Sequence, residues 1–107
     1  MINGWLRTFN TMNVGICKIK LRLPDNHSLK GKRHVIRPII AQLGNKFNVS
    51  VAEVSDQDMW QLATIGVGFV SDDTRFTNEV LSKVVSFVEN GNFDVEVLDC
   101  EMEIIPV

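Results

Sequence analysis

The sequence predicts an α+β domain whose strands and helices follow one another in the order βαββαβ. Apolar residues alternate with other residues, as in half-buried strands, in four segments: 14–23, 48–54, 62–71 and 93–105. Apolar residues recur at helical spacing in two further segments. The first is 29–46. The second begins after a cap at Asp72, Asp73 or Thr74 and runs to about 89. No internal repeat or low-complexity stretch interrupts this order. The order of the elements therefore determines the expected fold class.

The first predicted helix covers 29–46 and begins after Ser28, a residue type that caps helix N-termini well. Its expected core-facing side chains lie at helical spacing and are Leu29, Ile36, Ile40, Leu43 and Phe47. Pro38 lies inside this helix and lacks the N–H that would bond to His34, which predicts a kink or a tightened turn. Gly44 and Asn45 supply the expected helix stop.

Right-handed crossover connections between the strands favour a ferredoxin-like sandwich, an antiparallel four-stranded sheet with both helices on one face. In this arrangement the last strand lies beside the first. The outward acids of the last strand then face the outward cations of the first; the acids are Asp99, Glu101 and Glu103, and the cations are Lys18, Lys20 and Arg22. The side-chain alternation of the last strand changes parity near 97–98, which predicts a β-bulge.

The chain has 107 residues, the size of one domain, which we place at 12–107 with 1–11 as an N-terminal lead-in segment. The lead-in carries Trp5, Leu6 and Phe9, so we expect it to pack on a neighbouring strand or subunit. The net charge of −2 is unevenly distributed, because 1–53 hold nine cations and two acids whereas 54–107 hold two cations and eleven acids. Blocks of opposite sign either pair within the fold or make a two-faced surface. This balance argues against a general nucleic-acid coat but allows one local basic patch.

Composition and motifs exclude several classes of protein. No apolar run reaches the roughly 18 residues of a membrane span and nothing resembles a signal peptide, so we expect a cytoplasmic location. Cys17 and Cys100 are too few for a zinc site or a disulfide framework, and we expect them to be inward-facing small hydrophobes on neighbouring strands. His27 and His34 have no third ligand nearby, so we expect no metal and no cofactor. No catalytic motif is present, and we expect a binding protein rather than an enzyme.

The start of the first helix carries the clearest functional signal, because Lys30, Lys32 and Arg33 crowd its N-terminus. The helix dipole already places partial positive charge there, so each cation is disfavoured by about 0.3–1 kcal/mol before solvent screening. A helix start that presents cations and free N–H groups favours an anion, most naturally a phosphate. The basic pattern continues along one helix face, which comprises Lys30, Arg33, His34 and Arg37.

The hairpin 55–61 is expected at the same end of the sandwich as this helix start. It carries Asp56, Asp58 and Trp60. Trp60 either stacks on a nucleic-acid base or anchors the hairpin as an apolar side chain. The basic cluster is likewise either a phosphate or RNA site or a solvated face partly neutralised by Asp56 and Asp58. The candidate phosphate- or RNA-binding residues are Lys30, Lys32, Arg33, Arg37 and Trp60.

Four motifs stand out together: Met12-Asn-Val-Gly, Leu-Pro-x-x-x-Ser-Leu-Lys-x-Lys-Arg at 23–33, Phe47-Asn-Val-Ser-Val-Ala-Glu-Val, and Asp56-Gln-Asp-x-Trp-Gln at 56–61. With these motifs the chain resembles the YlxP-like family of small, uncharacterised bacterial proteins over 12–105. The resemblance implies the ferredoxin-like fold and, in some bacteria, a gene neighbourhood among translation and ribosome-maturation factors. It supplies no established activity and therefore no catalytic residues. Gly31 and Pro38 depart from the helix formers expected at their positions.

These observations predict an RNA- or ribosome-associated accessory factor that contacts phosphates through the basic start of the first helix. The alternative is a protein–protein or small-anion binding module with no nucleic-acid role. A further expectation concerns the sheet face opposite the helices, where an apolar strip comprises Val14, Ile16, Gly66, Gly68 and Val70. Such strips are usually covered, here by the segment that holds Trp5 to Phe9 or by a second copy of the chain, and we favour a homodimer.

Overall fold

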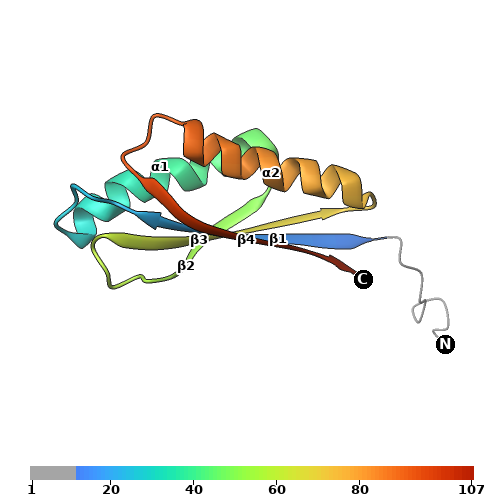
Figure 1. The fold of residues 1–107 in the computed structure, drawn as a ribbon, viewed down its shortest axis with the longest axis horizontal. Helices are drawn as coiled ribbons and strands as arrows, with labels where there is room; N and C mark the ends of the chain where they lie inside the picture. Colours follow the sequence, from blue (N-terminus) through green and yellow to red (C-terminus); the bar gives the residue numbers. More distant parts are fainter. Residues whose placement is uncertain (1–11) are drawn as a thin grey trace.

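The computed structural model describes residues 12–107 as one four-stranded antiparallel sheet with two helices on one of its faces (Figure 1). The elements are β1 (Asn13–Arg22), α1 (Leu29–Phe47), β2 (Ser50–Ser55), β3 (Leu62–Ser71), α2 (Thr74–Asn90) and β4 (Glu96–Pro106). The order βαββαβ is confirmed, and the strand order β2-β3-β1-β4 places β4 beside β1. The chain therefore has the ferredoxin-like α+β fold. The expectation for the lead-in 1–11 lies outside the described residues.

Opposite charges face each other across β1 and β4. Lys18 lies opposite Glu101 and Lys20 lies opposite Asp99 in the strand register. The register shifts directly after Lys20, which leaves Leu98 as an extra residue in β4. This extra residue is the expected β-bulge, and it explains why the side-chain alternation of the last strand changes parity.

The bulge also changes the partner of Arg22. Arg22 lies opposite Glu96, and its Nε and Nη2 donate to the Glu96 carboxylate at 3.0 and 3.2 Å. The expectation that Glu103 faces one of the β1 cations was wrong, because the register places Glu103 opposite Ile16. The β4 acids that face the β1 cations are thus Glu101, Asp99 and Glu96, so Glu96 takes the place expected for Glu103.

The core lies between the helix-facing side of the sheet and the two helices. Ile19 and Leu21 of β1 are fully buried there. They pack in one cluster with buried helix residues, including Ile36, Ile39 and Leu43 of α1 and Leu81, Val84 and Val88 of α2. Burial of each such side chain stabilises the fold by about 1.5–3 kcal/mol. The expected α1 stripe needs one correction, because Ile39 is fully buried whereas Ile40 is only partly buried at the edge of the core.

The ends of α1 differ in how well they were predicted. Ser28 is the N-cap, as expected, and its Oγ accepts the N–H of Gly31 at 2.9 Å. The expected stop at Gly44 and Asn45 was wrong, since the helix continues to Phe47. It ends at Asn48, whose φ of 54° is left-handed and whose N–H donates to the Gly44 carbonyl at 3.1 Å.

The second helix begins with the charge arrangement that helices usually have. Asp73 is its N-cap, and the Asp73 carboxylate accepts the N–H groups of Arg75 and Phe76 at 2.9 and 3.4 Å. An acid at this position complements the positive end of the helix dipole. Neither of the two helices in the described part of the chain is long and apolar enough to cross a membrane.

Candidate functional site

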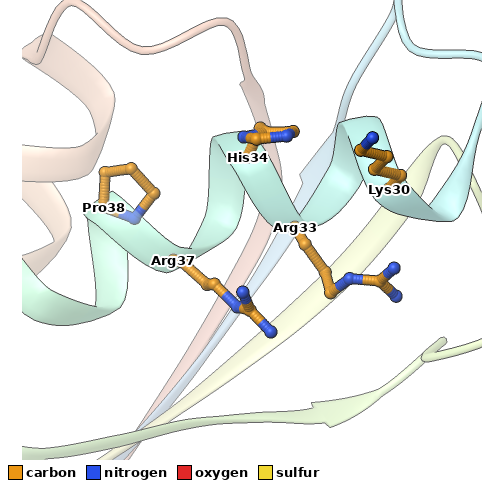
Figure 2. Close-up of a pocket in the computed structure, with 5 residues that line it drawn as sticks. All are labelled: Lys30, Arg33, His34, Arg37 and Pro38. Atoms are coloured by element: carbon orange, nitrogen blue, oxygen red, sulfur yellow. The ribbon is translucent and has the colours of Figure 1, made fainter.

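Four exposed residues of α1 form a continuous basic surface, which we call the basic stripe: Lys30, Arg33, His34 and Arg37. Together with Pro38 they line an open groove of about 580 Å³ (Figure 2). Arg33 and Arg37 extend from the same side of the helix, one turn apart (Figure 2). The ion pairs found within residues 12–107 involve none of these four side chains. The stripe therefore presents three permanent cations without a neutralising acid in the described part of the protein.

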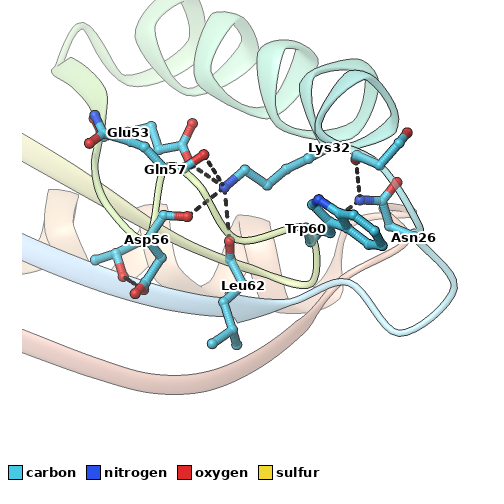
Figure 3. A network of polar contacts seen from close by, with 9 residues as sticks. Asn26, Lys32, Glu53, Asp56, Gln57, Trp60 and Leu62 are labelled. Carbon is cyan, nitrogen blue, oxygen red and sulfur yellow. Dashed lines mark hydrogen bonds and ion pairs between the residues drawn. The ribbon is translucent and has the colours of Figure 1, made fainter.

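Lys32 does not belong to this surface. Lys32 is buried, and its side chain points toward the loop between β2 and β3 (Figure 3). The Lys32 Nζ donates to the main-chain carbonyls of Asp56 at 2.7 Å, Gln57 at 3.3 Å and Leu62 at 3.0 Å. This geometry removes Lys32 from the phosphate-binding residues expected from the sequence. An ammonium group that is buried among carbonyls has no donor left for a phosphate.

Glu53 of β2 balances the buried charge of Lys32. The Glu53 Oε2 lies 2.7 Å from the Lys32 Nζ, and the two side chains are 22% and 3% exposed. Glu53 Oε2 is buried without a hydrogen bond of its own, since the three N–H groups of the ammonium are directed to the three carbonyls. The contact is thus mainly ionic. Lys32 and Glu53 together fix α1 to the β2–β3 loop.

The two aspartates of the hairpin do not neutralise the basic stripe. The Asp56 carboxylate accepts the hydroxyl of Thr64 at 2.8 Å, and Asp56 has a left-handed φ of 61° at the turn. Asp58 lies at the exposed hairpin tip and makes no ion pair with any residue of 12–107. Within residues 12–107, Glu53 is the acid that pairs with α1, and its partner is Lys32.

Asn26 joins the start of α1 to the hairpin. Its Nδ2 donates to the carbonyls of Ser28 at 2.7 Å and Trp60 at 2.6 Å (Figure 3). The Asn26 side chain packs so closely on Gly31 that a Cβ at position 31 would collide with its Oδ1. Gly31 therefore replaces the expected helix former because the cross-link from Asn26 needs the space of its missing side chain.

Trp60 is held beside the start of α1 by this cross-link, while its side chain remains 53% exposed. The neighbouring Met59 is also exposed, so the hairpin tip presents two apolar side chains to solvent. An indole in this position offers a flat surface on which a base can stack. The structure thus brings Trp60 and the helix start together, as the sequence predicted, but separates Lys32 from the remaining cations.

Two free cysteines lie side by side at the core. The sulfur atoms of Cys17 and Cys100 are 3.7 Å apart, and both thiols are free. Burial raises the pKa of the Cys17 thiol to about 12, and the neighbouring Cys100 adds to the shift. Both residues face inward on adjacent strands, as expected. Residues 12–107 contain no group of three or more His, Cys, Asp or Glu side chains arranged to hold a metal ion.

Sequence reasoning missed Asn26 and the role of Glu53 at this site. Asn26 and Trp60 are 34 positions apart, and no local pattern links them. The burial of Lys32 did leave a signal, since Lys32 precedes Ile36 by four residues and Ile39 by seven. This spacing places Lys32 on the core-facing side of the helix rather than on the basic stripe.

Comparison with known proteins identifies relatives of this chain. A family model described as "Protein of unknown function (DUF503)" matches residues 14–102. The uncharacterized protein YlxP of Bacillus subtilis (strain 168) is 35% identical over 77 residues, which cover 72% of this chain and 84% of that protein.

Two solved structures were compared with this chain, and one of them is similar in fold. The de novo designed protein Foldit4 is similar with a TM-score of 0.53 and 13% identity, over 90% of this chain and 98% of the designed chain. A C-terminal segment of the alpha subunit of aIF2 from Pyrococcus abyssi gives a TM-score of 0.45 and 11% identity, over 99% of this chain and 55% of that chain. The likeness to the designed protein concerns the fold alone. The match to the family model and the identity with YlxP together show that the chain belongs to the DUF503 family of YlxP-like proteins.

Proposed function

We propose that this protein is a non-catalytic accessory factor that binds RNA, on the ribosome or on its precursors, through the basic stripe of α1. The observation that carries the proposal is the set of three exposed cations, Lys30, Arg33 and Arg37, that no acid of residues 12–107 neutralises. Exposed cations on one helix face are disfavoured by mutual repulsion, and in the first turn also by the helix dipole. A bound phosphate backbone would relieve both effects.

The spacing of the stripe suits a chain of phosphates better than one isolated anion. Lys30, Arg33 and Arg37 recur about once per helical turn, so each can contact a different phosphate. The two arginines present planar forks that bind phosphate oxygens in pairs, and these contacts are stronger than those of a neutral donor. Trp60 adds an exposed aromatic surface beside the same helix start. Aromatic stacking combined with cations is a common way to bind single-stranded nucleic acid.

The family resemblance adds an argument from gene context. The implied neighbourhood among translation and ribosome-maturation factors favours ribosomal RNA as the source of the phosphates. The alternative is a protein or small-anion partner at the same groove, which combines cations with the apolar surface of Pro38. The two alternatives differ in salt dependence, because RNA binding releases counterions whereas a mostly apolar contact does not.

The proposal is tested by co-sedimentation with purified ribosomal subunits over a series of salt concentrations. The variant Lys30→Glu/Arg33→Glu/Arg37→Glu should lose binding while the wild type binds in a salt-sensitive manner. A matched control, Arg75→Glu/Lys83→Glu, reverses charges on α2 and should bind like the wild type. Binding that persists in the stripe variant, or absence of binding by the wild type at low salt, would overturn the proposal. Salt-insensitive binding would favour the protein partner.

A further inference from the structure

The sheet face opposite the helices carries two adjacent columns of opposite charge. The column on β1 consists of Lys18, Lys20 and Arg22, and the column on β4 consists of Glu101, Asp99 and Glu96, which lie opposite these cations in the register. Both helices lie on the other side of the sheet (Figure 1). No described element therefore covers these columns or the boundary between β1 and β4, which we call the seam.

One end of the seam is apolar. Val14 lies opposite Ile105 on one side and opposite Val70 on the other, so three apolar side chains form a row across β4, β1 and β3. Ile105 and Val70 are exposed, and Val70 is 58% exposed. Ile16, the next residue of β1 on this face, is exposed as well. A cluster of exposed apolar side chains beside the two charge columns is typical of a surface that another molecule covers.

The strand beside the seam, β3, has glycines where it borders Lys18 and Ile16. Gly66 lies opposite Lys18, and Gly68 lies opposite Ile16. A Cβ at Gly68 would meet no atom within 4 Å. The face is thus open beside Ile16, whereas Val54 of β2 lies over Gly66, where a Cβ would come within 2.7 Å of its Cγ1.

We propose that two copies of the chain associate through this face, about a two-fold axis that runs along the seam. Rotation about such an axis exchanges the two columns but keeps every residue at its level along the strands. Lys18 of one copy then meets Glu101 of the other, and Lys20 meets Asp99. At the apolar end, Val14 meets Ile105 of the second copy. One rotation therefore brings opposite charges together at the levels of Lys18 and Lys20 and apolar side chains together at the level of Val14. At the level between them, Ile16 meets Glu103 of the second copy.

Charge complementarity favours a second copy over the other candidate occupant. The lead-in segment 1–11 contains Arg7 as its one charged side chain and no acid. Such a segment contains no carboxylate that could pair with the cation column of β1. A copy of the same face supplies an acid opposite each cation of β1. This inference goes beyond the RNA-binding proposal, because the basic stripe lies on α1, on the opposite side of the sheet (Figure 1).

The inference is tested by sedimentation velocity and light scattering of the full chain over a concentration series. The wild type should be a dimer, and Lys18→Glu should weaken dimerisation at least about tenfold, because the introduced carboxylate would then face Glu101 of the second copy. The double variant Lys18→Glu/Glu101→Lys restores opposite charges across the interface and should dimerise again. The control Lys83→Glu makes the same charge change on the exposed side of α2 and should remain dimeric.

Loss of folding is separated from loss of dimerisation by circular dichroism and by a second variant. Ile105→Lys changes an exposed side chain and should yield a folded monomer, because it places two cations at the apolar end of the interface. A wild type that is monomeric at every concentration would overturn the inference. A folded Ile105→Lys or Lys18→Glu variant that dimerises like the wild type would overturn it too, as would a folded double variant that stays monomeric.

Discussion

At the scale of the residue, Lys32 shows that cations adjacent in the sequence can have different structural roles. In the sequence it is one of three cations at a helix start, but in the structure its ammonium is buried between three carbonyls and Glu53. The long apolar stem of lysine lies along the core side of α1 and carries the charge to the loop. The sequence contains the spacing that predicts burial, but the acid that makes burial possible lies on another element.

Lys32→Met should destabilise the fold strongly. The substitution keeps the apolar stem but leaves Glu53 without its counter-charge and three carbonyls without a donor, which costs about 3–5 kcal/mol for a buried pair. The measurement is the free energy of unfolding in urea. Lys30→Met, at an exposed position of the same helix, should change this energy by less than about 0.5 kcal/mol. A Lys32→Met variant within about 1 kcal/mol of the wild type would contradict the anchoring role.

The Cys17 thiol should be almost inert in the folded protein at neutral pH. Burial raises its pKa from the ordinary value of 9.0 to about 12, so the thiolate fraction at pH 8 is far smaller than that of an ordinary thiol. The rate of alkylation, followed by mass spectrometry, should keep rising with pH beyond 9, where an ordinary thiol levels off. Alkylation of Cys17 that levels off near pH 9 would show that the thiol is not shielded.

At the scale of the element, periodicity was enough to predict each helix and strand, because both layers bury one side and expose the other. The ends were harder to predict. The C-terminus of α1 is set by the left-handed conformation of Asn48 and not by the earlier Gly44, and Arg22 meets Glu96 because of the bulge at Leu98. The parity change predicted the bulge, but neither its effect on the partner of Arg22 nor the left-handed backbone of Asn48 follows from a sequence pattern.

The contact between Asn26 and Gly31 should appear as a strong coupling between the two positions. Gly31→Ala alone should destabilise the protein by more than about 1 kcal/mol, because its Cβ collides with the Asn26 side chain and displaces the cross-link to Trp60. In an Asn26→Ala background the collision is absent, and the same substitution should be neutral or stabilising, since alanine favours a helix over glycine by about 1 kcal/mol. Additive effects in this double-mutant cycle would contradict the proposed link.

Lys30→Glu should separate stability from binding. Glutamate in the first turn of α1 complements the helix dipole, so the variant should be more stable than the wild type by about 0.3–1 kcal/mol. The same variant should bind RNA more weakly, because it replaces a phosphate contact with a repulsive charge. Thermal unfolding and RNA binding are measured on the same preparation. A variant that is less stable, or that binds RNA like the wild type, would contradict this account of the stripe.

At the scale of the whole molecule, the uneven charge of the sequence divides into three parts. The cations of β1 are matched by acids of β4, Lys32 is matched by Glu53, and the basic stripe has no match within residues 12–107. The sequence predicted the first part from alternation and strand order. It could not separate Lys32 from the basic stripe, because whether a lysine is buried depends on contacts between distant elements.

The two proposed surfaces lie on opposite sides of the sheet and should act independently. Charge reversal of the stripe should leave the oligomeric state unchanged, and a folded monomeric Ile105→Lys variant should keep the affinity of each copy for RNA within about twofold. Light scattering and RNA binding of both variants check this independence. Loss of the dimer in the stripe variant would show that the surfaces are coupled.

The salt dependence of RNA binding tests the central claim most directly. Fluorescence anisotropy of a labelled single-stranded ribosomal RNA fragment gives the affinity of the wild type and of Lys30→Glu/Arg33→Glu/Arg37→Glu over a series of salt concentrations. Three phosphate contacts give a slope of about −2 in a plot of log affinity against log salt for the wild type, and the variant should show no measurable binding. Equal slopes for the two proteins, or no binding of the wild type at low salt, would contradict the claim that this stripe binds phosphates.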